Sequence, residues 1–458
     1  MSKRFDYEYI VIGSGVAGAT AAKQLAAAGR KVAVVEQSKW GGSEIHRRNV
    51  PQGALFSFSH LYAKAVAGSR FGLSSANLRY NYPSVLRWKE RAISRVATTK
   101  KELEEAGVTC LKGHAEFVGQ YDLSIGEDKN ISANKFILAS GTELDTAGIS
   151  GTDSVPYDTP ASILDMERPP KTVLVVGGGA SGCEVAQYLA ELGSKVVIVE
   201  LSSRLLPKED EEVGQIIQQY FEKRSGIKTF TQTRVTALER DRISPRVVFM
   251  RGGQERTVRV EKIVLATGSK PVLDFGLQKV GVSFDKNGVI VDRAFQTSAR
   301  NIYAVGDVLG GESSTERAVY SAELTVMNML SRNKNYANFN GFMRVTNTEP
   351  QIATVGLTED ELDKRARKYK KAIVPLSAVQ ASAIADFRIG FLKLLVDHQN
   401  KVLGATMVGP CAAEVLQEIA LAVRHGLSLV QIGSTPHVAE SWGNIVKVAA
   451  RKILNAKK

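Results

Sequence analysis

The chain has 458 residues, more than one hydrophobic core usually serves, so two or three domains are expected. Hydrophobic residues make up 44% and charged residues 23% of the chain, ordinary values that argue against a disordered protein. No apolar run approaches the ~20 residues needed to cross a bilayer, and the N-terminus lacks the apolar stretch of a signal peptide. We therefore expect a cytoplasmic protein without a membrane span.

The cysteines and the net charge limit which kinds of site and partner are expected. The chain has three cysteines, widely spaced and in no C-x-x-C pattern, so neither a disulfide framework nor a metal site is expected. The net charge of +13 could attract nucleic acid, but the basic residues are scattered and their clusters hold no interleaved aromatic residues. We do not expect nucleic acid as a partner, since a basic surface also suits anionic cofactors and substrates.

The first motif is a dinucleotide-binding fingerprint. A predicted strand over residues 9–12 leads into Gly13-x-Gly15-x-x-Gly18, an Ala-rich helix, a second strand and Glu36. The first glycine permits a tight turn, the second lets the backbone approach a pyrophosphate, and the third lets helix and strand pack closely. Glu36, at the end of the second strand, is placed to accept hydrogen bonds from a ribose.

The same unit recurs later in the chain. A predicted strand over residues 172–176 leads into Gly177-x-Gly179-x-x-Gly182, a helix, a strand and Glu200. In both copies the acidic residue follows the first glycine by 23 positions. The two units therefore indicate two homologous nucleotide folds.

The order of the remaining segments indicates that the second fold is inserted into the first. Similar strand-and-turn segments follow both copies, at residues 137–141 and 264–268. A third apolar strand ends in Gly-Asp at Asp307, a carboxylate that can bind a polyol hydroxyl. From about Gly341 the pattern changes to strands, at residues 391–396 and 402–408, and one amphipathic helix at residues 412–424.

These segments divide the chain into three predicted domains of α/β class. Two are nested Rossmann-like domains that bind FAD and NAD(P), and the third is a C-terminal α+β domain. The predicted boundaries are 1–148 with 270–335 for the FAD domain, 149–269 for the NAD(P) domain and 340–458 for the dimerisation domain.

Together these motifs resemble the class I pyridine nucleotide-disulfide oxidoreductases, the family of lipoamide dehydrogenase, glutathione reductase and mercuric reductase, over essentially the whole chain. The stretches that carry the resemblance include GSGVAG from Gly13, GGGASGCE from Gly177, TSARNIYAVGD ending at Asp307, and PQIATVGLTE from Pro350. The resemblance implies FAD in the first site, a nicotinamide dinucleotide in the second, and a homodimer whose partner completes the active site.

The resemblance also assigns binding residues to each site. The implied FAD residues are Gly13, Gly15, Gly18, Glu36, Gly41, Gly42, Ser43, Ala115, Ser140, Gly141, Asp307, Thr315 and Ala318. The implied nicotinamide-site residues are Gly177, Gly179, Gly182, Glu200 and Gly268.

The redox motif of the family is altered here. Glu44 and Asn49 occupy the positions of its two cysteines, and neither can form the mixed disulfide on which thiol exchange depends. Gly53 replaces the lysine of the motif, whereas the glutamate that pairs with this lysine in the family is kept as Glu184. Because a buried unpaired carboxylate is costly, we hypothesise that one of the adjacent arginines, at positions 47 and 48, supplies the missing charge.

The family's C-terminal catalytic motif is altered too. Pro436 and Glu440 fix the alignment, so Thr435 occupies the position of the general acid/base histidine. His437 lies two residues later, and two interpretations stay open: a structural histidine or a relocated proton donor.

The combined pattern predicts an FAD-dependent NAD(P)H oxidoreductase that reduces a small-molecule, non-disulfide acceptor directly from the flavin. A quinone is favoured because a basic loop, His46, Arg47 and Arg48, would stabilise a developing quinol anion. Oxygen and a second nicotinamide remain open as acceptors. The alternative is a non-catalytic flavin- and NADH-binding redox sensor or partner-binding protein.

Two residues of the second site indicate which nicotinamide cofactor it prefers. Glu200 repels a 2′-phosphate and therefore favours NAD(H) over NADP(H). Arg204, close by in the sequence, keeps NADP(H) open.

Overall fold

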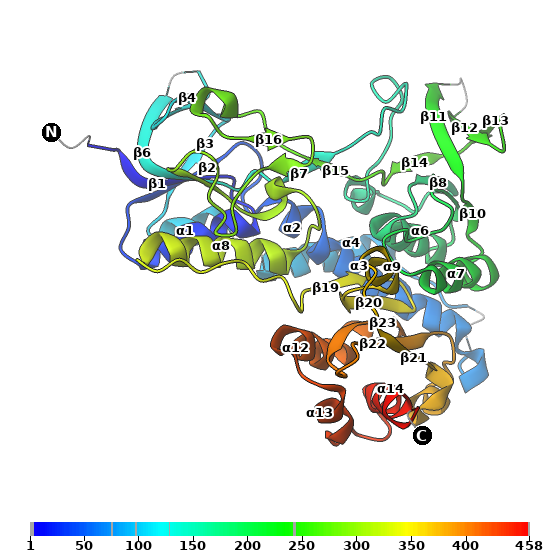
Figure 1. Ribbon diagram of the computed structural model, residues 1–458. Coiled ribbons are helices and arrows are strands. Elements are labelled where there is room, and N and C mark those ends of the chain that lie inside the picture. Colours follow the sequence, from blue (N-terminus) through cyan, green and yellow to red (C-terminus); the bar gives the residue numbers. More distant parts are fainter. Residues whose placement is uncertain (1–3, 75–76, 97–98, 128, 241–243, 457–458) are drawn as a thin grey trace. The chain divides into compact units, whose positions relative to one another are not determined.

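The computed structural model describes residues 4–74, 77–96, 99–127, 129–240 and 244–456 (Figure 1). The chain divides into two compact units. The first unit comprises Met1–Leu55, Asn81–Asp145 and Gly268–Asn338, and the second comprises Phe56–Tyr80, Thr146–Thr267 and Phe339–Lys458. The second unit thus contains most of the predicted NAD(P) domain together with the predicted C-terminal domain.

The first unit is built on a seven-stranded sheet of order β3-β2-β1-β6-β5-β4, with β18 also paired to β6. Parallel pairings join β3, β2, β1, β6 and β18, whereas β4, β5 and the first half of β6 form an antiparallel meander. The parallel strands are continuous apolar runs because helices or loops cover both faces. The seven strands of this sheet are β1 Tyr7–Ile12, β2 Val32–Glu36, β3 Thr109–Lys112, β4 Ala115–Gly119, β5 Asp122–Ile125, β6 Lys129–Leu138 and β18 Ile302–Ala304.

Two long helices of the first unit, α1 (Val16–Ala27) and α8 (Thr315–Leu330), lie side by side on one face of this sheet (Figure 1). Alanines line their buried faces, which lets the helices approach each other and the sheet closely. The other elements of this unit are α2 Gly42–His46, the start of α3 Asn49–Val66, α4 Tyr82–Val96, α5 Lys100–Glu105, β7 Thr142–Leu144, β15 Ser269–Pro271, β16 Phe284–Asp285 and β17 Gly288–Val289.

The second unit contains a parallel four-stranded sheet of order β10-β9-β8-β14. Its first strands and helix reproduce the strand–loop–helix–strand order of β1, α1 and β2, as the repeated motif predicted. An antiparallel sheet, β11-β12-β13, follows. The bounds are β8 Thr172–Val176, α6 Ala180–Glu191, β9 Lys195–Val199, α7 Glu211–Tyr220, β10 Lys228–Phe230, β11 Thr233–Arg240, β12 Pro245–Arg251, β13 Gln254–Arg259 and β14 Lys262–Leu265.

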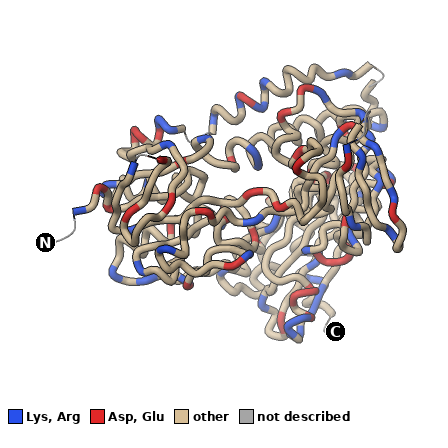
Figure 2. The backbone as a smooth tube through the Cα atoms, turned by 90° about the horizontal axis from the view of Figure 1, so that it is seen from above, with Lys and Arg blue, Asp and Glu red and all other residues tan. Residues whose placement is uncertain are grey.

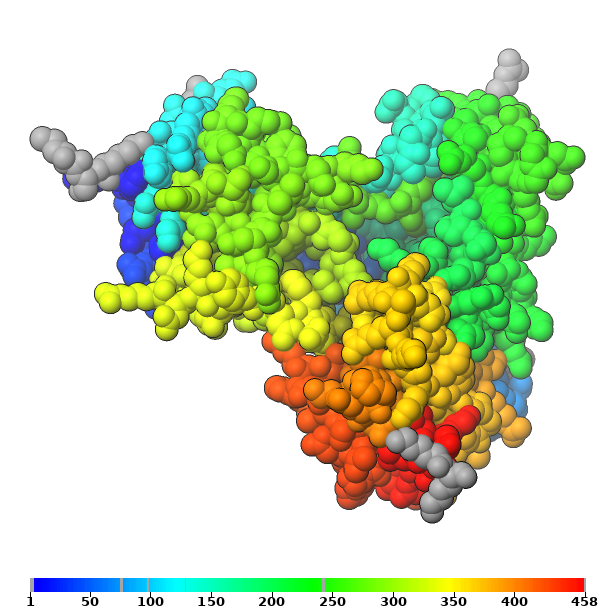
Figure 3. All heavy atoms as spheres, viewed as in Figure 1, coloured from blue at the N-terminus to red at the C-terminus, as the bar shows by residue number. Residues whose placement is uncertain are grey.

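The C-terminal part of the second unit is an antiparallel five-stranded sheet of order β19-β20-β23-β22-β21, packed against helices. The orange and red segments of Figure 3 show the last strands and helices as one packed mass. The bounds are β19 Met343–Thr346, β20 Gln351–Gly356, α9 Glu359–Lys364, β21 Lys370–Pro375, α10 Gln380–Ile384, β22 Phe391–Val396, β23 Val402–Gly409, α13 Leu429–Ser434 and α14 Asn444–Asn455.

The prediction of a single helix over residues 412–424 is wrong in one respect. The structure forms two helices there, α11 (Ala412–Val415) and α12 (Gln417–His425), which meet at Leu416. Leu416, with φ −80° and ψ 0°, separates the two helices, and its side chain is fully buried in the core. The amphipathic period continues through this break, so the sequence pattern cannot reveal it.

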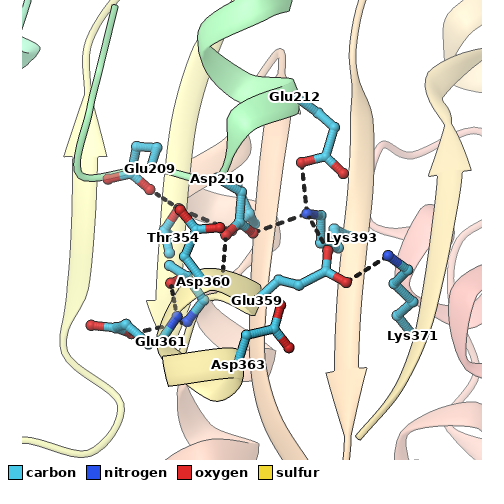
Figure 4. A network of polar contacts seen from close by, with 12 residues as sticks. Glu209, Asp210, Glu212, Thr354, Glu359, Asp360, Glu361, Asp363, Lys371 and Lys393 are labelled. Carbon is cyan, nitrogen blue, oxygen red and sulfur yellow. Dashed lines mark hydrogen bonds and ion pairs between the residues drawn. The ribbon is translucent and has the colours of Figure 1, made fainter. Parts of the chain in front are cut away.

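A buried ionic network joins α7, α9 and β22 within the second unit (Figure 4). The Lys393 side chain is 1% exposed, and its Nζ lies 3.0 Å from Asp210, 2.9 Å from Glu212 and 2.9 Å from Glu359. Burial opposes the charged ammonium, but its hydrogen bonds with Glu212 and Glu359 raise the pKa of Lys393 overall. These carboxylates lie close enough together to hold a metal ion, and the ammonium lies among them.

Basic and acidic residues alternate along much of the chain in both units (Figure 2). No helix among the described residues is both long enough and apolar enough to span a membrane.

Candidate active site

The first glycine loop leaves no room for side chains. Gly13 has a φ of +103°, and a Cβ on it would lie 2.3 Å from the carbonyl oxygen of Ala139. A Cβ on Gly18 would lie 2.0 Å from the carbonyl oxygen of Gly13. Gly15 caps α1 without a side chain, and the first turn of α1 holds no acidic residue. The free N–H groups at this helix start therefore suit a pyrophosphate.

Glu36 is buried and holds this loop in place. Its carboxylate accepts hydrogen bonds from the N–H of Ser14 at 2.9 Å, the hydroxyl of Ser14 at 2.7 Å and the N–H of Ser38 at 2.6 Å. The Ser14 hydroxyl in turn accepts the N–H of Gly41 at 3.2 Å. Glu36 thus orders the loop through Ser14, a residue that the sequence motif did not single out.

The segment after β2 approaches the glycine loop closely. Gly41 and Gly42 both have positive φ, and a Cβ on Gly42 would lie 2.5 Å from the Cα of Gly15. Ser43, next in α2, is exposed. Only glycine at position 42 therefore lets the two loops meet.

The two former cysteine positions are joined by polar contacts. Glu44, on α2, forms hydrogen bonds with Asn49 and Thr315, and Asn49 Nδ2 donates to Thr315 Oγ1 at 2.9 Å. Burial raises the pKa of Glu44, and the hydrogen bonds from Thr315 and Asn49 only partly offset this. Glu44 therefore retains its proton to higher pH than an exposed glutamate.

The basic residues of this loop are engaged within the first unit. Arg48 donates to Asp307 Oδ2 at 2.9 Å and to Thr142 Oγ1 at 3.1 Å. The His46 ring lies 2.8 Å from the carbonyl oxygen of Trp40 through Nε2. The Arg48 guanidinium is thus paired with Asp307 within its own unit, and the hypothesis that Arg47 or Arg48 neutralises Glu184 stays a prediction.

The remaining predicted FAD residues lie on the same unit. Ala115 is buried at the start of β4, so only its backbone is open to a ligand. Ser140 donates its hydroxyl to the carbonyl of Val272 at 3.0 Å, and Gly141 has positive φ. Ala318 is buried on α8.

The second glycine loop repeats the geometry of the first. Gly177 has a φ of +105°, and its Cβ would lie 2.4 Å from the carbonyl oxygen of Ala266. A Cβ on Gly182 would lie 2.0 Å from the carbonyl oxygen of Gly177. Gly179 caps α6, again without a side-chain cap or an acidic residue in the first turn. This helix start offers the same free N–H groups to a second pyrophosphate.

The acidic residue of the second unit also holds its loop. Buried Glu200 accepts the N–H of Gly178 at 2.6 Å and the N–H of Ser202 at 2.6 Å. Arg204 donates to Asp360 at 2.8 Å, so the guanidinium that kept NADP(H) open is engaged in an ion pair.

Glu184 is buried in α6, five residues into the helix that follows this loop. Its Oε1 accepts the N–H of Asn347 at 2.6 Å. Burial raises the pKa of Glu184 to about 7, although the Asn347 hydrogen bonds and the charge of His60 act to lower it. His60, which acts electrostatically on Glu184, is a residue that the sequence analysis did not consider.

The altered C-terminal motif lies near the end of the second unit. The side chain of His437 is 7% exposed, and its ring nitrogens contact the carbonyl oxygen of Thr435 at 2.8 Å and the carboxylate of Glu418 at 3.0 Å. Glu440 is exposed. Because both ring nitrogens are occupied within the chain, these contacts favour a structural role for His437.

The three cysteines are free. Burial raises the pKa of Cys110 to about 11, and burial also raises the pKa of Cys183 and of Cys411. The Cys183 thiol donates to the carbonyl of Gly178 at 3.3 Å. All three thiols are therefore poor nucleophiles at neutral pH.

The two units thus each gather one set of predicted residues. The implied FAD residues, Glu44 and Asn49 belong to the first unit, whereas the second glycine loop, Glu184, Glu200, His437 and Glu440 belong to the second. Gly268, predicted for the nicotinamide site, is assigned to the first unit at its boundary.

Comparison with known proteins agrees with this geometry. Residues 7–322 match the family described as pyridine nucleotide-disulphide oxidoreductase, and residues 342–448 match the dimerisation domain of the same family. The chain is 29% identical to a mercuric reductase from Bacillus cereus over 436 residues, which cover 94% of this chain and 69% of that protein. It is 27% identical to a dihydrolipoyl dehydrogenase from Staphylococcus aureus over 453 residues, covering 97% and 96%.

Solved structures share the fold. An HOCl-induced flavoprotein disulfide reductase from Escherichia coli matches with a TM-score of 0.86 at 21% identity, covering 97% of this chain and 99% of that one. LpdA from Mycobacterium tuberculosis matches with a TM-score of 0.86 at 23% identity, covering 97% and 99%. The nested glycine loops, the C-terminal sheet and these matches together lead to one conclusion: the chain belongs to the pyridine nucleotide-disulphide oxidoreductase family.

Proposed function

We propose that this protein, a flavin-dependent pyridine nucleotide oxidoreductase, passes hydride from a nicotinamide in the second unit to FAD in the first and then reduces a non-disulfide acceptor directly. The observation that carries the proposal is the hydrogen-bonded set of Glu44, Asn49 and Thr315 at the former disulfide. Neither Glu44 nor Asn49 can exchange electrons with a thiol, and the three free cysteines have raised pKa values.

The residues of the first unit fit FAD. The first glycine loop, with Gly13 and Gly18 packed against backbone, and the free start of α1 would hold its pyrophosphate, and Glu36 would meet a ribose. Asp307 would bind the polyol chain in competition with its partner Arg48. When bound, the flavin supplies the hydride chemistry, and the protein positions it.

The acceptor that we favour is a quinone or a similar compound that takes up protons with its electrons. Glu44 has a raised pKa, so its carboxyl group can hold a proton and donate it to a reduced acceptor. The basic loop offers less support than the sequence suggested, because the charge of Arg48 is balanced by Asp307.

An anaerobic titration with NADH, followed at the flavin absorption bands, tests this function. We expect full reduction after one NADH per FAD, without a thiolate charge-transfer band, and reoxidation by an added benzoquinone faster than by oxygen. The double variant Glu44→Cys/Asn49→Cys, which places thiols at the two hydrogen-bonded positions, is the positive control and should take up two further electrons. Uptake of four electrons by the parent protein would contradict the proposal, and full reduction without reoxidation by any acceptor would favour the redox-sensor alternative.

We further propose NAD(H) as the cofactor of the second site, since Glu200 is a buried carboxylate in its loop and Arg204 is paired with Asp360. Glu200→Gln removes the charge while keeping an acceptor for the loop. It should shift the NADPH-to-NADH preference toward NADPH by about tenfold, the size of one charge interaction of ~1.4 kcal/mol. The measurement is kcat/KM for both nucleotides. Glu36→Gln, the matching change in the first unit, should leave this ratio unchanged, and an unaltered ratio in Glu200→Gln would refute the assignment.

We also propose a homodimer formed through the C-terminal dimerisation domain. Large apolar side chains remain exposed there, including Leu421 at 56%, Val430 at 56% and Val438 at 67%. Apolar groups exposed in this way are typical of a surface that a partner covers.

A further inference from the structure

A buried polar cluster connects α3, α6 and the loop between β19 and β20 within the second unit. His60 Nδ1 lies 2.8 Å from the carboxylate of Glu191, which also accepts the hydroxyl of Ser59 at 2.6 Å. Asn347 bridges to Glu184: its N–H donates to Glu184 at 2.6 Å, and its carbonyl oxygen lies 3.4 Å from His60 Nε2. The side chains of His60 and Glu191 are 18% and 9% exposed, so solvent screens this cluster poorly.

The spacing of these residues along α3 and α6 brings them together. Glu184 and Glu191 are seven residues apart on α6 and therefore share a face of that helix. His60 lies seven residues after Gly53 along α3, two turns beyond the position without a side chain. The histidine of α3 thus contacts Glu191 of α6 directly and is connected to Glu184 through Asn347.

The other titratable groups around this cluster do not supply a second cation for Glu184. Glu349 acts on His60 and is paired with Lys64 at 2.8 Å. Tyr220 faces Glu349 and Glu191, and burial raises its pKa to about 12, so it stays neutral. Among the described residues that act on Glu184, the cationic group is His60.

We propose that His60, held by Glu191, is the positive partner of Glu184 and that this pair governs the affinity of the second site for oxidised nicotinamide. The inference rests on the proposed function, in which the second glycine loop binds a nicotinamide dinucleotide. Glu184 lies about 6 Å of helix axis beyond the start of α6, where the second glycine loop would hold the dinucleotide. Hydride loss leaves the nicotinamide ring with a positive charge, which an ionised Glu184 attracts and a protonated Glu184 does not.

The sign of the pH effect follows from the two groups. Burial raises the pKa of Glu184 to about 7, so its carboxylate forms as the pH rises through neutrality. Burial acts to lower the pKa of His60, but the hydrogen bond and charge of Glu191 raise it overall. The two groups therefore titrate as a coupled pair, and NAD⁺ should bind more tightly above neutral pH than below it.

The test is calorimetric titration of the FAD-loaded full chain with NAD⁺ and with NADH between about pH 6 and pH 9, on both sides of an ordinary histidine pKa. We expect the affinity for NAD⁺ to rise by about tenfold across this range, as for a charge interaction at ~10 Å. Glu184→Gln should remove the rise. His60→Gln should move its midpoint upward by about one pH unit or more, and His60→Lys, which keeps a permanent charge, should move it downward.

Opposite shifts of the pH midpoint in His60→Gln and His60→Lys separate a charge effect from a structural one. Loosened packing would move both midpoints in the same direction. His425→Gln, an exposed histidine at the end of α12, is the matched control and should shift nothing. Equal midpoints in the parent, His60→Gln and His60→Lys would overturn the inference.

Infrared difference spectra keep this test independent of nucleotide binding. The carboxyl band that is absent from Glu184→Gln should titrate at higher pH in His60→Gln than in the parent. If neither nucleotide binds at any pH, the proposed function fails, while the infrared shift still decides whether His60 is the partner of Glu184.

Discussion

Lys393→Met is expected to lower the free energy of unfolding by about 3–5 kcal/mol, because it leaves a buried group of carboxylates without its cation. Asp210, Glu212 and Glu359 all lie within 3.0 Å of the Lys393 ammonium, and the lysine side chain is 1% exposed. Methionine fills similar volume, so lost packing adds little. Urea denaturation followed by circular dichroism measures the change.

Lys371→Met is the matched control for this prediction. Lys371 also pairs with Glu359, but its side chain is 48% exposed, so we expect a loss of only about 0–1 kcal/mol. A Lys393→Met protein within 1 kcal/mol of the parent would contradict the assigned role of the network. If Lys393→Met does not accumulate as folded protein, Lys393→Arg, which keeps the charge, should restore folding.

The effect of Lys393→Met should also depend on pH. Although burial opposes ionisation of Glu359, its hydrogen bonds with Lys371 and Lys393 lower its pKa to about 2 from an ordinary value of 4.5. The contribution of this carboxylate to stability is therefore complete above about pH 4.5 and is lost as the pH falls toward 2. The difference between parent and variant should shrink over the same window.

Exchanging one glycine in each nucleotide loop for alanine should weaken the binding of one cofactor at a time. Gly18→Ala places a Cβ 2.0 Å from the carbonyl oxygen of Gly13, and Gly182→Ala places one 2.0 Å from that of Gly177. Alanine usually favours a helix over glycine by about 1 kcal/mol, but a clash with backbone outweighs this, since overpacking costs about 1–3 kcal/mol. We expect Gly18→Ala to lose FAD affinity and Gly182→Ala to keep FAD while losing NADH affinity, each by about 10- to 100-fold.

The measurements are the flavin-to-protein absorbance ratio after dialysis and the quenching of NADH fluorescence. Gly53→Ala is the steric control, since a Cβ there meets no atom within 4 Å, and it should keep the FAD content of the parent. Normal FAD retention by Gly18→Ala, or FAD loss caused by Gly182→Ala in folded protein, would contradict the assignment of the sites.

The local features of the fold followed from the sequence. The strands β8 and β22 have the predicted bounds, and the first and third glycines of both loops have the predicted tight geometry. These features depend on residues close together in the chain: apolar period, positive φ at glycine, and packing between adjacent elements. The break at Leu416 was missed because the amphipathic period continues through it.

The sequence alone therefore predicted the two nucleotide folds and the family, both of which the fold and the comparisons support. Only the tertiary structure identified the partners of the charged groups: Asp307 for Arg48, Glu191 for His60 and the three carboxylates around Lys393. The physical reason is that a buried charge is stabilised by whichever opposite charge the fold brings within a few ångströms. That partner lies far away in the chain, and no local pattern of residues records it.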